Sequence, residues 1–256
     1  MLKNIKEYVK TKKENLKSNS ILAIIQIGNN EASNRYVKNK IKDCEEVGIP
    51  VYLLKASESI NQQQLEEMVR MADRVANAII VQLPLPAHLD KNAILNLIPR
   101  EKDVDGFRAD SLYKPCTPKG IMDYLADCGL SDFSGKNVTI IGRSDIVGKP
   151  LAMMMLEANA TVTICHSKTK DLYPHIMGAD IIVCAVGKEN FLDCSSLSED
   201  VIIIDVGINI DKNGKLVGDC CNTQGKQVTP VPGGVGSVTT SVLVGHVVEA
   251  AMRKYA

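Results

Sequence analysis

Short apolar runs alternate with helix-like segments along almost the whole chain, and this alternation restricts the fold more than any other feature of the sequence. Residues 21–27 are almost continuously apolar, which is typical of a strand covered on both faces of a sheet. The runs with this character are 21–27, 51–54, 78–81, 138–141, 161–165, 181–185 and 201–206. Because strands joined by helical crossovers form parallel sheets, the sequence predicts an α/β protein.

Helical periodicity marks the segments between these strands. Residues 31–47 form one such segment, which Gly48 ends, and Thr117 followed by Pro118 has the form of an N-cap and a first helical residue. The expected helices are 31–47, 61–75, 91–97, 117–128 and 238–253. An Asn-Gly pair within 211–215 predicts a hairpin turn that projects from the sheet.

The charge balance and the cysteines argue against several classes of function. The 30 basic and 30 acidic side chains give a net charge of zero, and with 3 Phe and no Trp nothing favours a nucleic-acid or acidic-membrane partner. The first 17 residues are basic and lack the apolar core of a signal peptide; they predict an amphipathic helix with Leu2, Ile5, Val9 and Leu16 facing inward. The 8 cysteines show no zinc-like spacing, so we expect no metal site. Because no export signal is indicated, we expect reduced thiols and a soluble, cytoplasmic protein.

A glycine-containing loop joins the strand expected at 138–141 to an apolar helical pattern. Gly142 and Gly148 lie in this loop, and backbone N–H groups at such a helix start can point at a phosphate. The spacing departs from the usual dinucleotide-binding motif, because Ser144 occupies the position of the second glycine. The loop alone therefore leaves dinucleotide binding and an ordinary strand-to-helix turn equally open.

The end of the next strand favours one cofactor over another. Residues 160–165 are followed by His166, Ser167 and Lys168, where an NAD site usually places an acid on the ribose 2′-hydroxyl. This chain has no acid there, and Arg143 lies in the preceding loop. A basic side chain without an acid fits a 2′-phosphate, so the sequence predicts NADP rather than NAD.

A serine, a tyrosine and a lysine share one face of the helix expected at 31–47. Ser33, Tyr36 and Lys40 stand at positions i, i+3 and i+7. On spacing alone a solvated helix face is the favoured interpretation, because other charged side chains lie nearby. A tyrosine beside a partly desolvated lysine is nevertheless suited to proton transfer, so a catalytic face stays open.

Several longer segments match one known family, in the family's order and over almost the whole chain. They are ASNRYVKNKIKDCEEVGI, IIVQLPLPAHLD, KDVDGF, PCTPKGIMDYL, GRSDIVGKPLA, ADIIVCAVGK, IIIDVGIN and TPVPGGVG. With these segments the chain resembles the bifunctional methylenetetrahydrofolate dehydrogenase/methenyltetrahydrofolate cyclohydrolase family. The resemblance implies NADP-dependent oxidation of 5,10-methylenetetrahydrofolate to the methenyl form, and hydrolysis of that form to 10-formyltetrahydrofolate.

The resemblance also implies how the chain is divided. Residues 1–116 together with 238–256 would form a folate-binding catalytic domain, to which the C-terminal helix returns. Residues 117–237 would form a Rossmann-like NADP-binding domain. A homodimer would form through the cofactor domain by way of the hairpin arm.

The resemblance assigns roles to individual residues. Lys40 would transfer protons in the cyclohydrolase step with help from Tyr36, and Gln82 would hydrogen-bond Lys40 and help to keep it neutral. Asp105 would bind the amino-pyrimidine edge of the pterin. Ser33, Tyr36, Pro232, Gly233 and Gly234 would line the folate site. Gly142, Arg143, Ser144, Ser167 and Ile208 would contact NADP. Without the family, Gln82 is interpreted as a polar strand end and Asp105 as a turn residue before Gly106.

The chain departs from the family pattern in three places. The connection between Phe107 and Pro115 is short, residues 218–228 are unusual, and residues 237–246 lack the usual residues after the glycine-rich turn. Two alternatives therefore stay open: a monofunctional NAD-linked dehydrogenase of the same family, and a non-catalytic folate- or nucleotide-binding protein. A shikimate-dehydrogenase-like enzyme does not explain the segments VQLPLP and KDVDGF.

Overall fold

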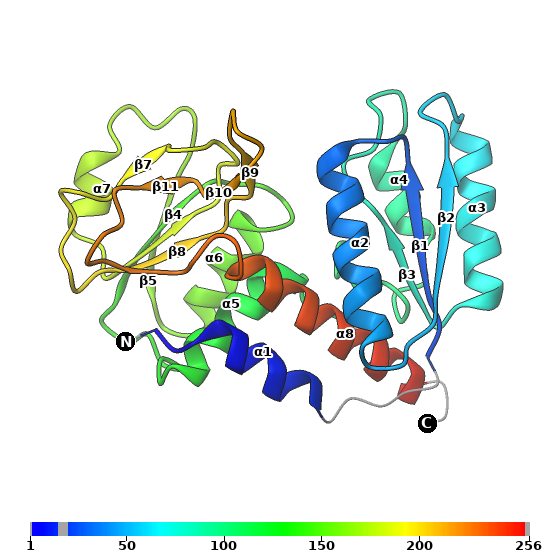
Figure 1. Cartoon of the computed structure of the whole chain (residues 1–256), viewed down its shortest axis with the longest axis horizontal. Coiled ribbons are helices and arrows are strands. Elements are labelled where there is room, and N and C mark those ends of the chain that lie inside the picture. Colours follow the sequence, from blue (N-terminus) through cyan, green and yellow to red (C-terminus); the bar gives the residue numbers. More distant parts are fainter. Residues whose placement is uncertain (1, 15–19, 254–256) are drawn as a thin grey trace. The chain divides into compact units, whose positions relative to one another are not determined.

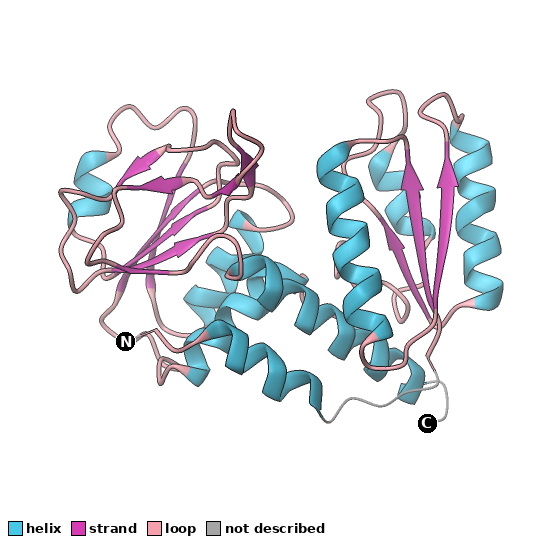
Figure 2. Cartoon of the chain, in the orientation of Figure 1, coloured by secondary structure: helices cyan, strands magenta, loops and turns pink. Residues whose placement is uncertain are grey.

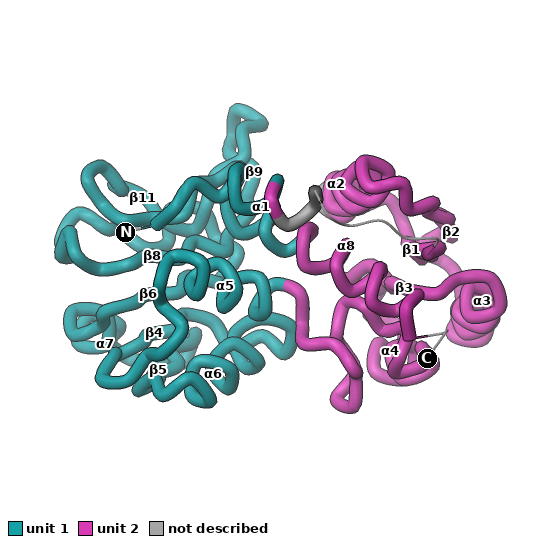
Figure 3. Tube along the Cα trace, turned by 90° about the horizontal axis from the view of Figure 1, so that it is seen from below, with its two compact units in different colours: residues 1–10, 117–239 teal, residues 11–116, 240–256 magenta. Residues whose placement is uncertain are grey.

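The computed structural model describes residues 2–14 and 20–253, and the chain divides into two compact units. Unit 1 comprises Met1–Lys10 and Thr117–Thr239, and unit 2 comprises Thr11–Cys116 and Thr240–Ala256 (Figure 3). Helices and strands alternate through both units, as the sequence predicts (Figure 2). The chain is therefore α/β, with one parallel sheet in unit 2 and a larger one in unit 1.

Met1–Lys10 group with unit 1, while the expected catalytic domain comprises residues 1–116 and 238–256. Ile5 and Tyr8 of helix α1 (Ile5–Glu14) are buried in one cluster with Tyr124 and Val238. The rings of Tyr8 and Tyr124 meet edge to face at 5.6 Å, and the Tyr124 hydroxyl donates to the carbonyl of Lys3 at 2.6 Å. These contacts connect the start of α1 to unit 1. Leu16, expected to face inward on the same helix, lies outside the described residues.

Unit 2 is built on a three-stranded parallel sheet in the order β2-β1-β3. Its strands are β1 (Leu22–Ile27), β2 (Val51–Ala56) and β3 (Ala78–Val81), and its helices include α2 (Glu31–Glu45), α3 (Gln62–Val75) and α4 (Lys91–Leu97). Leu22 and Ile24 face a core shared with α2 and the C-terminal helix, and Ala23 and Ile25 face a core shared with α3 and α4. Both faces of β1 are therefore buried, which explains its almost continuous apolar run (Figure 1).

Unit 1 contains a five-stranded parallel sheet in the order β12-β8-β6-β4-β5. Its strands are β4 (Asn137–Ile141), β5 (Thr161–Cys165), β6 (Ile181–Cys184), β8 (Ile202–Asp205) and β12 (Gln227–Val228). Its helices include α5 (Cys116–Asp127), α6 (Gly148–Glu157) and α7 (Tyr173–Met177). Short pairs complete the unit: β7 (Leu192–Asp193) with β11 (Cys220–Cys221), and β9 (Asn209–Ile210) with β10 (Leu216–Val217). The last pair is the predicted hairpin.

Two helix starts differ from the prediction. Helix α5 begins at Cys116, so Thr117 lies in its first turn instead of capping it, and the Thr117 hydroxyl accepts a hydrogen bond from Thr239 at 3.1 Å. Helix α8 (Val235–Arg253) begins three residues earlier than predicted, directly after a glycine pair. It is the one helix among the described residues that is long and apolar enough to cross a membrane, and most of it is buried in the protein.

Candidate functional site

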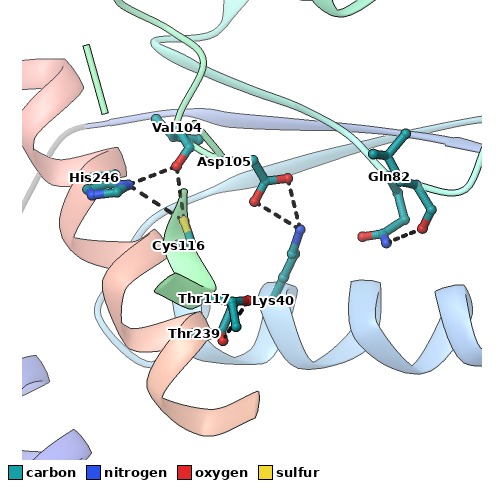
Figure 4. Close-up of polar contacts among 9 residues, drawn as sticks. Lys40, Gln82, Val104, Asp105, Cys116, Thr117, Thr239 and His246 are labelled. Carbon is teal, nitrogen blue, oxygen red and sulfur yellow. Dashed lines mark hydrogen bonds and ion pairs between the residues drawn. The ribbon is translucent and has the colours of Figure 1, made fainter. Parts of the chain in front are cut away.

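Lys40 and Asp105 form a buried ion pair in unit 2. The Lys40 ammonium, on α2, donates to both carboxylate oxygens of Asp105 at 3.3 and 3.2 Å (Figure 4). Only 9 % of the Lys40 side chain and 8 % of the Asp105 side chain are exposed. Burying either charge without a partner would cost desolvation free energy, and in this pair each charge stabilises the other.

The segment 102–106 places Asp105 beside the sheet. Asp103 pairs with Ile79 of β3 in a parallel bridge, and the amide of Ile79 donates to the carbonyl of Lys102 at 2.8 Å. The chain then turns at Gly106, whose φ is +72°. A Cβ atom at this position would lie 2.7 Å from backbone atoms of Tyr113 and Lys114, so a side chain here would force the short connection 107–115 away from Asp105.

The helix face that carries Ser33, Tyr36 and Lys40 points into the protein. Ser33 and Lys40 are buried and Tyr36 is partly buried, so the solvated-face interpretation of their spacing is wrong. Asn30 caps the helix: its side-chain oxygen accepts a hydrogen bond from the amide of Ser33 at 3.0 Å. This cap fixes where the helix begins and therefore which of its side chains face the protein interior. Burial raises the pKa of Tyr36 above its ordinary value, so its phenol is neutral at physiological pH.

Gln82 follows β3 directly, as predicted, but its contacts differ from the expectation. Its amide nitrogen Nε2 donates to the carbonyl of Leu83 at 2.8 Å, and its buried oxygen Oε1 has no hydrogen-bond partner among the described residues. The expected hydrogen bond between Gln82 and Lys40 is not formed. An ammonium gains more from a carboxylate than from a neutral amide, which explains why Lys40 pairs with Asp105 instead.

A second buried glutamine next to Gln82 escaped the sequence analysis. Gln26 of β1 is 1 % exposed, and its Nε2 donates to Asn34 Oδ1 of α2 at 2.7 Å. Its Oε1 is also without a partner among the described residues. The amide of Gln82 donates to the carbonyl of Ile25, so the two glutamines are neighbours on adjacent parallel strands. The sequence feature that could have indicated Gln26 is that it is the one polar residue inside an apolar strand.

The loop after β4 in unit 1 requires its glycines. Gly142 has φ +127°, and a Cβ atom there would lie 2.3 Å from the carbonyl oxygen of Ala185. A Cβ atom at Gly148, the first residue of α6, would lie 2.2 Å from the carbonyl oxygen of Gly142. The loop and the helix start are therefore in close backbone contact, as in the strand-loop-helix arrangement of dinucleotide sites.

The exposed groups at this edge of the sheet are mostly hydrogen-bond donors. Strands β4 and β5 are adjacent and in register, with Ile141 opposite Cys165, so the loops with Arg143 and with Ser167 leave the same edge. Arg143, Ser144, Ser167 and Lys168 are exposed. The Ser144 hydroxyl also accepts the amides of Val147 and Gly148 at 3.1 and 3.4 Å, and Asp145, the one acid of the loop, pairs with Lys149 at 2.7 Å. This donor set fits a phosphate group.

Two buried aspartates, neither of which was predicted from the sequence, fix the loops that follow β6 and β8. The Asp219 carboxylate accepts the amides of Val186, Gly187 and Lys188 at 2.7 to 2.9 Å. Asp205 accepts the amide of Asp219 at 3.0 Å. Because their partners are mainly backbone amides, no spacing of side chains in the sequence indicates these contacts.

The remaining predicted residues also lie in unit 1. Ile208 is partly buried, and its Cδ1 atom would be 3.1 Å from a Cβ atom at Gly236. Gly233 has φ +91°, and a Cβ atom at Gly234 would lie 2.1 Å from the carbonyl oxygen of Pro230, so the turn 230–234 requires glycine. Pro232, Gly233 and Gly234 belong to a different unit from Lys40, and their part in a folate site stays a prediction.

The chain matches two family models that together span most of its length. Residues 1–105 match the tetrahydrofolate dehydrogenase/cyclohydrolase catalytic domain, and residues 115–255 match the NAD(P)-binding domain of the same enzymes. A bifunctional protein FolD from Acidovorax ebreus is 45 % identical over 256 residues, with 93 % of this chain and 91 % of the relative covered.

Two solved structures are similar over nearly the full length. The bifunctional methylenetetrahydrofolate dehydrogenase/cyclohydrolase of Campylobacter jejuni has a TM-score of 0.88 at 41 % identity, covering 98 % of this chain and 95 % of that one. The Trypanosoma brucei dehydrogenase-cyclohydrolase, complexed with NADP and an inhibitor, has a TM-score of 0.92 at 29 % identity, covering 100 % and 98 %.

Proposed function

Because the chain belongs to the tetrahydrofolate dehydrogenase/cyclohydrolase family, we propose how its own residues carry out the family's two reactions. The protein is a methylenetetrahydrofolate dehydrogenase and methenyltetrahydrofolate cyclohydrolase of one-carbon metabolism. Its substrates are tetrahydrofolate derivatives, and unit 1 contains an NAD(P)-binding domain. The choice of cofactor, the roles of single residues and the state of assembly are the parts that we propose.

NADP is the cofactor that the residues of unit 1 favour. Arg143 is exposed and forms no ion pair with a described residue, so its guanidinium is free to bind an anion. Ser167 and Lys168 follow the adjacent strand and add further donors. Arg143 and Ser167 would hold the 2′-phosphate, and Gly142 and Ser144 would lie against the cofactor. Bound NADP would supply the hydride acceptor for the oxidation.

The buried Lys40–Asp105 pair is the observation on which the proposed folate site depends. Asp105 would accept two N–H groups from the amino-pyrimidine edge of the pterin, a bidentate contact that suits a carboxylate. When the substrate engages Asp105, Lys40 loses its carboxylate partner while it stays buried. Lys40 would then be placed to accept a proton during the reaction.

The hydrolysis needs a proton acceptor more than a nucleophilic side chain. The methenyl group is cationic, so water can attack it directly once a base takes the proton of the water. Lys40 would take that proton, and the neutral phenol of Tyr36 would orient the water or relay the proton. Ser33 and the Oε1 atom of Gln82 would complete the polar groups that unit 2 supplies.

An absorbance assay tests the proposal. Methylenetetrahydrofolate is supplied with NADP or with NAD, reduced cofactor and methenyl product are followed, and methenyl decay is then measured without cofactor. We expect reduction with NADP and enzyme-dependent decay, and we expect Lys40→Met to abolish the decay while NADP binding is retained. Unchanged decay in Lys40→Met would contradict the role of Lys40. Faster turnover with NAD would favour the NAD-linked alternative.

Assembly and location complete the proposal. We propose a homodimer formed through unit 1 by the β9–β10 hairpin, because the strand pair carries Ile210, an exposed large apolar side chain. We propose a cytoplasmic enzyme, since the eight cysteines, all among the described residues, form no disulfide.

A further inference from the structure

The carbonyl oxygen of Val104, the residue before Asp105, receives two side-chain hydrogen bonds. His246 of α8 contacts it through Nδ1 at 2.9 Å, and the thiol of Cys116, the first residue of α5, donates to it at 3.2 Å (Figure 4). His246 and Cys116 are both buried and lie 3.6 Å apart. Since a carbonyl oxygen only accepts hydrogen bonds, Nδ1 of His246 carries the hydrogen.

The backbone of Asp105 is held on its other side as well. The amide of Cys116 donates to the carbonyl of Asp105 at 3.3 Å, and the amide of Gly106 donates to the carbonyl of Asp103 at 3.0 Å. The peptide before Asp105 and the peptide after it are therefore each tied to another part of unit 2. Rotation of either peptide would move the Asp105 carboxylate away from Lys40.

The ring of His246 is itself fixed by the short connection 107–115. The rings of Tyr113 and His246 lie 4.9 Å apart at 40°, and the Tyr113 hydroxyl donates to the carbonyl of Glu101 at 3.2 Å. The guanidinium of Arg253, the last residue of α8, lies 5.9 Å from the centroid of the Tyr113 ring. The imidazole thus has one defined orientation, with Nδ1 toward Val104.

We propose that His246 is a positioning residue for Asp105, acting through the carbonyl of Val104 together with Cys116. The proposal rests on the proposed function of Asp105 as the group that binds folate and pairs with Lys40. His246 does not touch the reacting atoms. Its hydrogen bond fixes the peptide that carries Asp105, and so it sets where the carboxylate meets Lys40 and the pterin.

Two substitutions separate the hydrogen bond from simple packing. In His246→Asn the amide nitrogen occupies the position of Nδ1, so the donor to Val104 is kept while the ring is lost. In His246→Leu the apolar volume is largely kept while the donor is lost. Cys116→Ser and Cys116→Ala form a matched second pair, since serine keeps a donor and alanine does not.

The experiment measures KM and kcat for methylenetetrahydrofolate in the oxidation and for methenyltetrahydrofolate in the hydrolysis. Thermal unfolding checks that each variant is folded. We expect His246→Leu to raise the folate KM roughly 10- to 100-fold in both activities, because a small displacement of a binding group has effects of this size. We expect His246→Asn to stay within about threefold of the wild type. A packing defect would lower the amount of active enzyme, and hence kcat, without raising KM.

Crystal structures of the ligand-free variants give a result that does not depend on activity. We expect the Lys40–Asp105 pair to open in His246→Leu and to persist at 3.2 Å in His246→Asn. An intact pair and an unchanged KM in His246→Leu would overturn the proposal, as would an Asn variant that fails as completely as the Leu variant. If the His246 variants do not fold, the Cys116 pair decides by the same two criteria. An inactive wild type would contradict the proposed function, and the crystal structures would still decide on His246.

Discussion

Lys40 and Asp105 stand 65 positions apart in the chain, yet their charged groups meet 3.2 Å from each other with little exposure to solvent. The lysine comes from the middle of a helix and the aspartate from a segment beside the sheet. Among the described residues neither charge has another ionic partner, so each depends on the other. This dependence predicts how the fold responds when one of them is removed.

Removing either charge should destabilise the protein more than removing both. Lys40→Met leaves the Asp105 carboxylate buried alone, and Asp105→Asn leaves the ammonium alone, so we expect each to lower the free energy of unfolding by about 3–5 kcal/mol. The double variant should lose clearly less than the sum of the two. Urea unfolding of the four proteins measures this coupling, and strictly additive losses would show that the pair does not stabilise the fold.

Arg143→Ala should weaken NADP far more than NAD. The guanidinium is the exposed basic group of the loop after β4, and only NADP offers it a 2′-phosphate. We expect roughly a tenfold to hundredfold rise in the KM for NADP, which corresponds to the loss of a charge-assisted hydrogen bond. The KM for NAD should change little. Lys149→Ala in the next turn is a suitable control, because Lys149 is already paired with Asp145. Equal losses for both cofactors would remove the 2′-phosphate argument.

Replacing Asp219 should disturb the cofactor unit without touching the folate site residues of unit 2. Three consecutive backbone amides, at 186–188, would lose their acceptor in Asp219→Ala. These three hydrogen bonds are only part-buried, so water can replace part of the lost acceptor, and we expect a total loss of about 1–3 kcal/mol in the free energy of unfolding. Asp219→Asn should be nearly as damaging, because its NH₂ group would face these donors. Urea unfolding measures the loss, and near-wild-type stability of Asp219→Ala would contradict it.

The stability of the protein should depend on pH through Asp103. Burial raises the pKa of Asp103 above its ordinary value, although hydrogen bonds from Arg108 and Ser111 oppose the rise. In the pH range between the ordinary and the raised pKa, the folded state binds more protons than the unfolded chain, so this group makes stability fall as pH rises. Relative to the wild type, Asp103→Asn should therefore gain stability as pH increases from about 4 through the raised value. Unfolding free energies across this range test the sign, and a variant that loses relative stability instead would show that the carboxylate is favoured by its hydrogen bonds.

Shortening the hairpin tests the assembly. Replacing residues 211–215 by a two-residue Asn-Gly turn should keep unit 1 folded, because the β9–β10 pair lies outside its five-stranded sheet. We expect light scattering to report a monomer for this variant and a dimer for the wild type. Ile210→Asp should have the same effect, and a dimer in both variants would place the interface elsewhere.

The strands could be predicted because burial on both faces leaves a direct signal in the sequence. The run at 138–141 and β4 (Asn137–Ile141) differ by one residue, and the hairpin at Asn213-Gly214 is where its turn residues predict it. The same signal does not predict that the face of α2 with Ser33, Tyr36 and Lys40 points into the protein. This helix carries many charges, and what distinguishes Lys40 is a carboxylate far along the chain.

Other parts of the site left no local signal. Asp205 and Asp219 act on backbone amides, which every residue possesses, so no pattern of side chains marks them. The role of His246 depends on a carbonyl oxygen 142 positions earlier. The start of α5 at Cys116 is similar, since Thr117 and Pro118 have the composition of a helix start while the hydrogen bonds of Cys116 to Val104 and Asp105 place the first turn one residue earlier.

The discontinuous make-up of unit 2 has a consequence for how the chain is synthesised. Leu22 and Ile24 share their core with Leu243 and Val247, and Ser20 donates to the carbonyl of Val247 at 2.8 Å across 227 positions. During translation the β1 strand therefore leaves the ribosome long before the helix that covers one of its faces, and the whole of residues 117–239 is made in between. The sheet of unit 2 is therefore synthesised early and receives one of its covering helices late, so an apolar face of this sheet is exposed in the nascent chain while residues 117–239 are made.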